Sequence, residues 1–234
     1  MRAILIAGVM LSMGSGDLLM LNQSELGPGP PPGWQVRPVK GQDAPELEIR
    51  GDGLDRVLRI SGTGQAAWFY RDLRDEDLPD DLTLRWSWRV LEAPAASDLQ
   101  TRRTDDSPIR VYVAFGNPGA LFGGSGRIIF YSFGNAEPDG YAGESHQSGR
   151  MHVVRVDGAS ERGVWREHAT HPANDYRRIW GRTPPPITAV GVMQDTDQTG
   201  RRAVAELRLL DLGAPPAETP PPEARAGRSG PPSR

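Results

Sequence analysis

Apolar and polar residues alternate along several short segments of the chain. In residues 82–90, LTLRWSWRV, every second position from Leu82 to Val90 is apolar and the positions between are polar. Residues 109–115, IRVYVAF, repeat the pattern, with Arg110 and Tyr112 opposite the apolar face. A period of two with aromatic content is typical of a strand that buries one face. We therefore expect Arg110 and Tyr112 on the exposed face of a sheet.

Six more segments have the apolar content of strands: 56–60, 66–70, 127–133, 151–156, 187–193 and 203–210. Glycine, aspartate and proline join them, and the chain holds 28 Gly and 22 Pro. Many short strands with such turns are typical of a sandwich or barrel. We expect an all-β fold, an antiparallel, jelly-roll-like β-sandwich. One short helix is predicted at 172–181, with Pro172 at its start and Gly181 as its terminator, and it should cap one end of the sandwich.

The two ends of the chain predict a single domain with extensions. Residues 1–16 resemble a short secretory signal, with an apolar run after Arg2, although a frayed terminus has the same features. Residues 17–33 include GPGPPPG and read as an extended spacer. The β-sandwich should occupy 34–212, and the Pro-rich tail 213–234 should be disordered. These features favour an exported protein of the periplasm or cell envelope, with a cytoplasmic one as the alternative.

The composition and charge of the chain exclude several classes of protein and several kinds of site. A net charge of −3 argues against a general nucleic-acid binder, which needs a basic face. The absence of cysteine excludes disulfides, thiolate zinc sites and a cysteine nucleophile. After residue 16 no apolar run reaches the roughly 18 residues of a membrane span, so no transmembrane segment is predicted.

Four blocks together resemble a known bacterial family: VLRISGTGQAAWFYRDL, LRWSWRV, TRRTDDSPIRVYVAF and DYRRIWGRTPPPITAVGVMQDTDQTG. In this order they look like the domain of unknown function 3047, over approximately residues 33–212. The resemblance implies a leader for export and no established activity. Two positions depart from it. Tyr131, Ser132 and Phe133 stand where a Tyr-x-Trp is expected, and ELRL stands at 206–209 in place of an aromatic pair and Gly-Asp.

The segment DTDQTG at 195–200 allows three interpretations. Asp195, Asp197 and Thr199 have the oxygen spacing of a calcium loop, but the flanks are strands and two arginines follow, which argues against an EF-hand. A looser calcium site on Asp195 and Asp197 remains open. An aspartate-rich turn ending at Gly200 is the simplest interpretation. Acid–base chemistry by two neighbouring carboxyls is the third.

A second group of polar residues surrounds the strand at 109–115. Asp105 and Asp106 precede it, Arg110 and Tyr112 project from it, and Tyr131 lies on the next strand. A face of tyrosine, arginine and aspartate offers aromatic planes for sugar rings and bidentate groups for hydroxyls. Solvated cross-strand pairs are the alternative. If 82–90 joins the same sheet, Arg85 and Arg89 share this face.

No motif identifies an enzyme. The glycine-rich loop 116–127 lacks the Gly-Lys-Ser/Thr ending of a phosphate loop, and His168 and His171 lack the spacing of a zinc hydrolase. Leu121 and Phe122 at the tip of that loop are candidates for a partner contact.

We therefore expect a non-catalytic envelope module that binds carbohydrate, with no required cofactor and with calcium as an optional structural ion. The alternatives are a hydrolase or lyase for polysaccharides that uses paired aspartates, and a structural or protein-partner domain.

Overall fold

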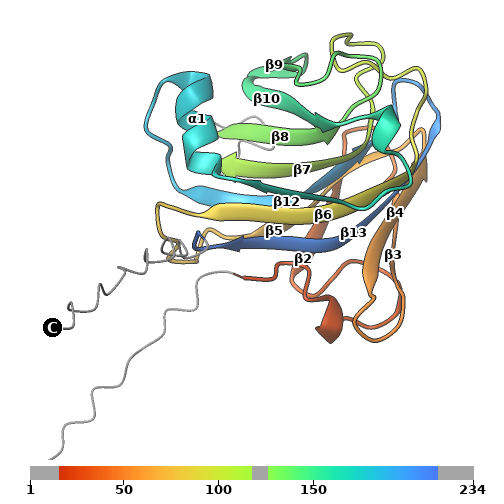
Figure 1. Ribbon diagram of the computed structural model, residues 1–234, viewed down its shortest axis with the longest axis horizontal. Helices are drawn as coiled ribbons and strands as arrows, with labels where there is room; N and C mark the ends of the chain where they lie inside the picture. Colours follow the sequence, from red (N-terminus) through yellow and green to blue (C-terminus); the bar gives the residue numbers. More distant parts are fainter. Residues whose placement is uncertain (1–15, 118–125, 216–234) are drawn as a thin grey trace, which may run out of the picture.

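The computed structural model describes residues 16–117 and 126–215, which form two stacked β-sheets (Figure 1). The first sheet has six strands, in the order β1 (Gly27–Pro28), β3 (Glu46–Arg50), β4 (Val57–Thr63), β13 (Arg202–Gly213), β6 (Thr83–Glu92) and β11 (Arg166–Thr170). Every pair of neighbours in this sheet is antiparallel.

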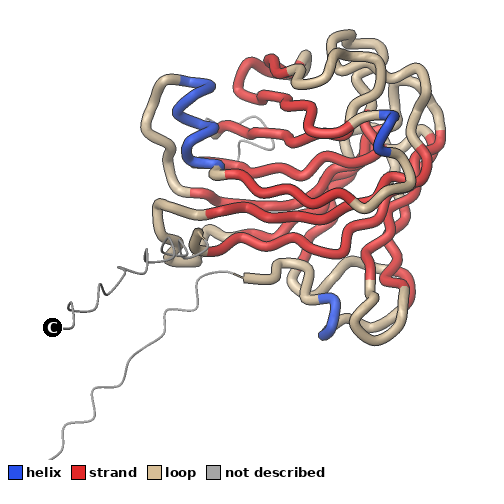
Figure 2. The backbone as a smooth tube through the Cα atoms, viewed as in Figure 1, coloured by secondary structure: helices blue, strands red, loops and turns tan. Residues whose placement is uncertain are grey.

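The second sheet has seven strands, in the order β2 (Trp34–Pro38), β5 (Ala66–Asp72), β12 (Ile187–Asp195), β7 (Ser107–Phe115), β8 (Arg127–Phe133), β10 (Ser148–Asp157) and β9 (Ala142–Ser145). Its neighbours are antiparallel except β8 and β10, which run parallel with Met151 opposite Ile128. Strand dominates the backbone (Figure 2), so the predicted β-sandwich is confirmed. All eight predicted strands are present. Strands β1, β2, β3, β9 and β11 were not predicted, although β3 alternates between polar and apolar residues over its five positions.

The main hydrophobic core lies between the two sheets. The alternating faces predicted for β6 and β7 both point into it: Trp86 and Trp88 from one sheet meet Val111 and Val113 from the other, all at most 1% exposed. Burial of so much aromatic and branched surface is the main stabilising contribution to the sandwich.

The predicted helix is α1 (Pro172–Trp180), and it lies at one end of β7 and β8 (Figure 1). Gly181 ends it at φ 62, a left-handed conformation that glycine adopts without strain. Tyr176 is buried against Phe115, with ring centroids 4.9 Å apart, so the helix closes that end of the core. Two single-turn 3-10 helices, η1 (Leu21–Gln23) and η3 (Ala159–Glu161), lie at the periphery.

A second hydrophobic cluster covers the outer face of the seven-stranded sheet. Tyr112, Phe130 and Trp68 pack there beneath Leu99, from the segment between β6 and β7. The expectation that Arg110 and Tyr112 lie exposed is therefore wrong: they are 4% and 0% exposed. The alternation placed them on the correct face, but that face is itself covered.

Gly191 makes the close packing of this face possible. It lies on β12 between Tyr70 of β5 and Tyr112 of β7, in register with both. A Cβ atom at this position would lie 2.1 Å from the Phe69 carbonyl oxygen. Only glycine therefore lets the neighbouring strand approach so closely.

The segment 17–33 is a further correction, because its first part is packed rather than a spacer. Leu18, Leu19 and Leu21 are buried in the main core. The backbone of Asp17 pairs with that of Asp211 in an isolated antiparallel β-bridge. The Trp34 indole donates a hydrogen bond of 2.7 Å to the Leu18 carbonyl. The folded unit thus begins before residue 34.

Three expectations fall on residues outside the described part of the chain. They are the signal over residues 1–16, of which only Gly16 is described, the tail beyond residue 215, and the partner contact at Leu121 and Phe122. Within the described ranges, no helix has both the length and the hydrophobicity that a membrane crossing requires.

Candidate functional site

The two aspartate segments meet in space, although some 90 residues separate them in the sequence. Strand β12 pairs with β7, and Asp195 at the end of β12 lies opposite Ser107 at the start of β7. This register places Asp106 beside the turn that follows β12. One carboxylate oxygen each from Asp106, Asp195 and Asp197 lies within 4.8 Å of the others.

Asp106 holds the 195–200 turn through three hydrogen bonds. Its Oδ1 accepts from the Gln198 amide at 3.1 Å, and its Oδ2 accepts from the Thr199 amide at 2.8 Å and from the Thr199 hydroxyl at 2.5 Å. The Asp106 side chain is fully buried. A buried carboxylate with several donors fixes the position of the segment that supplies them.

The turn is anchored from its other side by Thr196. Its hydroxyl donates to the Gln65 carbonyl at 2.9 Å and accepts from the Gln65 amide at 2.9 Å. Gly200 closes the turn at φ 62, where its amide donates to the Thr196 carbonyl. The Asp-Thr-Asp segment thus forms a turn, and both sides of it are attached to the sandwich.

Arg110 forms an ion pair with this group of carboxyls. Its Nη2 donates to the backbone carbonyl of Asp105, and its Nη1 lies 3.8 Å from Oδ2 of Asp195. Its Nε is buried and has no hydrogen-bond partner. Oδ1 of Asp105 and Oδ1 of Asp197 are also buried without a partner. The region therefore holds three polar atoms that the protein itself does not satisfy.

Burial and mutual repulsion raise the pKa values of the carboxyls. Burial raises the pKa of Asp195 to about 8, and the charges of Asp197 and Asp106 add to the effect, while Arg110 opposes it. The pKa of Asp197 is raised by burial and by the charge of Asp106, and that of Asp105 mainly by burial. At 3.8 Å the guanidinium is too distant to offset the burial of Asp195.

A cavity of about 510 Å³ opens beside this group, on the outer face of the seven-stranded sheet. Every strand of that sheet contributes to its lining: Arg37 and Pro38 from β2, Trp68 from β5, Met193 and Asp195 from β12, Arg110 from β7, Phe130 from β8, Met151 from β10 and Ser145 from β9. Lys40, Gln147, Asp197 and Gln198 from the adjoining turns complete its rim. The cavity thus combines aromatic and thioether surface with amide and charged groups.

Four of the residues expected at a polar binding face lie elsewhere. Tyr131 points from β8 into the main core, where its ring lies 5.2 Å from that of Trp86 and its hydroxyl donates to Asp175. Arg85 and Arg89 belong to the other sheet, because β6 is not a neighbour of β7. Tyr112 lies under the cavity, in edge contact with Trp68 at 5.2 Å, and is not among the lining residues.

Sequence reasoning missed most of the lining. Trp68 was predicted only as part of a strand. It is the sequence neighbour of Phe69, and because side chains alternate along a strand, the two point to opposite faces of the sheet; this was a signal that Trp68 faces away from the core. Gln147 and Gln198 lie on turns and carry no local signal. Their place at the cavity depends on the strand order of the sheet, which alternation does not reveal.

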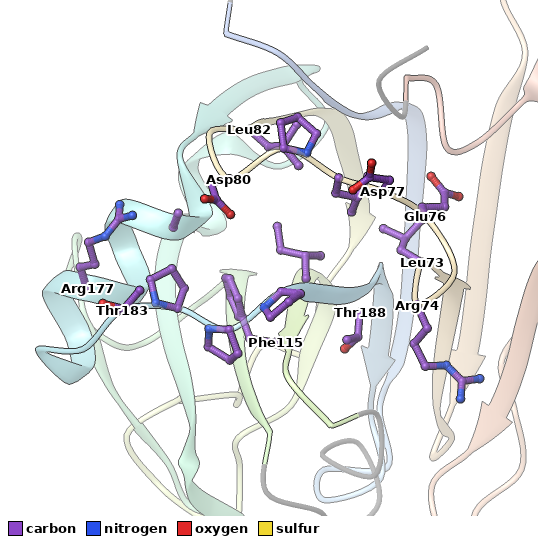
Figure 3. Close-up of a pocket in the computed structure, with 17 residues that line it drawn as sticks. Leu73, Arg74, Glu76, Asp77, Asp80, Leu82, Phe115, Arg177, Thr183 and Thr188 are labelled. Atoms are coloured by element: carbon purple, nitrogen blue, oxygen red, sulfur yellow. The ribbon is translucent and has the colours of Figure 1, made fainter. Parts of the chain in front are cut away.

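A second hollow, of about 320 Å³, lies at the opposite end of β12 beside α1 (Figure 3). Prolines 184–186 belong to its lining. Thr183 and Arg177 lie on one side of it in Figure 3, and Arg74, Glu76 and Asp77 lie on the other. It contains none of the residues that the sequence singled out as candidate ligands.

A family model described as "Protein of unknown function (DUF3047)" matches residues 32–210, well over half of the chain. The chain belongs to the DUF3047 family. The resemblance found in the four sequence blocks is thereby confirmed, and membership of DUF3047 assigns no activity. Among curated proteins, none matches the sequence.

Solved structures with a similar arrangement include proteins that act on or bind polysaccharides. One is the xyloglucanase domain of a type three effector from Sinorhizobium fredii, with 9% identity, 82% of this chain and 99% of that chain covered, and a TM-score of 0.44. Another is the family 11 carbohydrate-binding module of a Clostridium thermocellum cellulosomal cellulase, with 12% identity, 82% and 97% coverage, and a TM-score of 0.43.

The enzymatically active domain of tailspike protein 4 from bacteriophage CBA120 is also similar, with 11% identity, 78% of this chain covered and a TM-score of 0.40. The DUF3047 chain spans only 19% of that tailspike chain. A likeness this distant carries no argument for a shared function.

Proposed function

We propose that the protein binds an oligosaccharide in the cavity on the outer face of the seven-stranded sheet. The observation that supports this most is the convergence of Trp68, Arg110 and the Asp195–Asp197 pair on one cavity. Sugars present apolar C–H faces and polar hydroxyl edges, so they require both kinds of surface in one place.

The size and the chemistry of the cavity agree with such a ligand. About 510 Å³ falls within the roughly 300–1,000 Å³ typical of ligand sites. Trp68 and Phe130 supply aromatic surface, while the amides of Gln147 and Gln198 supply both donors and acceptors. Both signs of charge are present along the lining, which favours a neutral polyhydroxylated ligand over a strongly anionic one.

The geometry gives no support to a polysaccharide hydrolase. One oxygen each from Asp106, Asp195 and Asp197 lies within 4.8 Å of the others, which is closer than the about 6.5–9.5 Å between the carboxyl groups of inverting glycosidases. Both oxygens of Asp106 also accept hydrogen bonds from the turn. Asp106 is therefore engaged in holding the turn.

The protein-partner alternative also lacks support among the described residues. The large apolar side chains exposed there are five in number and come from different parts of the sequence: Leu26, Val36, Leu54, Val164 and Leu209. A docking face for a protein usually has a contiguous apolar patch.

The test is a glycan array, followed by calorimetric titration of the best oligosaccharide. The double variant Gln147→Ala/Gln198→Ala removes two amides from the rim and spares the Gln198 backbone bond to Asp106. Loss of two hydrogen bonds should weaken binding by about tenfold or more. Gln23→Ala on η1, an exposed glutamine outside the cavity, should bind like the wild type. Equal affinity of the double variant and the wild type would refute the assignment of the site.

A further inference from the structure

Four carboxyl groups gather at the end of β12. Asp105, Asp106, Asp195 and Asp197 influence one another electrostatically, and Arg110 opposes them, with His146 acting on Asp105 as well. Arg110 donates from its Nη2 to a backbone carbonyl, and its Nη1 lies 3.8 Å from Oδ2 of Asp195. The carboxyls therefore outnumber the basic groups that act on them in this part of the described structure.

A second, independent observation concerns hydrogen bonding. Asp105 is 5% exposed, yet its Oδ1 has no partner, and the buried Oδ1 of Asp197 has none either. Buried carboxylate oxygens without donors are rare, because such an oxygen loses its hydration without compensation. A buried oxygen of this kind, close to other carboxylates, calls for a partner such as a bound cation or water.

The donor set and its dimensions select the ion. All the candidate ligands are oxygens, which are preferred by hard divalent cations. Ligands on opposite sides of Ca²⁺ lie up to about 4.6–5.2 Å apart, whereas those of Mg²⁺ lie up to about 4.0–4.2 Å apart. The three oxygens lie within 4.8 Å of one another, a span that the larger calcium shell accommodates.

Asp106 remains available as a ligand despite its hydrogen bonds. Each carboxylate oxygen has two lone-pair positions, and Oδ1 accepts only the Gln198 amide. Its three donors also hold the carboxylate in a fixed position, as groups behind metal ligands commonly do.

We propose that Asp106, Asp195 and Asp197 bind a calcium ion, with Asp105 beside them, and that the ion fixes the β12–β13 turn at the rim of the cavity. The site does not require that the cavity bind a sugar. It differs from an EF-hand loop, because Asp106 comes from a distant segment just before β7 and Glu206 instead pairs with Arg89 in the other sheet.

Calcium should raise the thermal midpoint of the full chain. For a dissociation constant near 10 μM, 1 mM calcium raises the midpoint by roughly 5–10 °C over excess chelator. Asp195→Asn and Asp197→Asn should each abolish most of this rise in the thermal midpoint, and both variants should remain folded by circular dichroism. Asp197 is only half-buried, so its substitution disturbs the fold less than that of Asp195. Asp55→Asn, an exposed aspartate on the β3–β4 turn, should keep it.

Terbium luminescence locates the ion, because Trp68 lines the adjoining cavity and can sensitise Tb³⁺. Emission should appear with the wild type and Asp55→Asn, disappear with excess calcium, and be lost in Asp195→Asn and Asp197→Asn.

Absence of both the thermal rise and the emission in the wild type would overturn the proposal, as would emission that the two variants leave unchanged. Stabilisation by Mg²⁺ but not by Ca²⁺ would overturn the choice of ion. Oligosaccharide binding measured in chelator tests the proposed function separately.

Discussion

Removal of the Asp106 side chain tests how the site is held together. In Asp106→Ala, the amides of Gln198 and Thr199 and the Thr199 hydroxyl lose their acceptor. The 195–200 turn then keeps its attachment to Gln65 through Thr196 but not its attachment to the start of β7. We expect a protein that is folded but less stable, with a loosened turn.

The size of the loss follows from the environment of the three donors. Hydrogen bonds to a charged group contribute about 1.5–3 kcal/mol each, and three in one network are not additive. Gln198 is exposed and Thr199 is half-buried, so water can replace part of what is lost. We therefore expect a decrease of about 2–4 kcal/mol in the free energy of unfolding, which lowers the thermal midpoint by roughly 5–15 °C.

The assay is chemical denaturation in excess chelator, so that an ion contributes nothing to the difference. Asp98→Ala is the matched control, because Asp98 accepts a single exposed bond from the Gln100 amide, and it should cost less than about 1 kcal/mol. Hydrogen exchange should also accelerate at the Gln198 and Thr199 amides in Asp106→Ala. A variant within about 1 kcal/mol of the wild type, with unchanged exchange at both amides, would refute this account of the turn.

Two further predictions concern the sandwich itself. Gly191→Ala should cost about 1–3 kcal/mol or more by denaturation, because its Cβ would lie 2.1 Å from the Phe69 carbonyl oxygen; full stability would contradict the packing described for this face. Asp157 is buried, but hydrogen bonds from His168 and Trp88 outweigh burial and lower its pKa below the ordinary value of 3.8. Its stabilisation is thus present above that value and lost as pH falls through the lower, folded-state pKa. The stability difference between wild type and Asp157→Asn should therefore narrow as the pH falls below about 3.8, and a difference that stays constant there would contradict the assignment.

The strands and the main core could be predicted because alternation is a local property. The apolar positions of β6 and β7 identified which faces turn inward without any knowledge of partners. The assignment of strands to sheets was out of reach, since it depends on long-range pairing. Arg85 and Arg110 illustrate this, because similar strand patterns carry them in different sheets.

The site was predicted only in part, for two physical reasons. Aspartates 105, 106, 195 and 197 were singled out by their spacing, but their meeting depends on the pairing of β7 with β12. The exposure of Tyr112 was misjudged because Leu99, from a loop without any periodic pattern, packs over that face. Alternation shows that two faces of a strand differ, and it does not show what covers the second one.

The most direct test is a crystal structure of the protein with the oligosaccharide that binds best on the array. We predict sugar rings in the cavity of the seven-stranded sheet, with a ring on Trp68 and hydroxyls near Gln147 and Gln198. Sugar density in the hollow beside α1 (Figure 3), or on the six-stranded sheet, would contradict the proposed function.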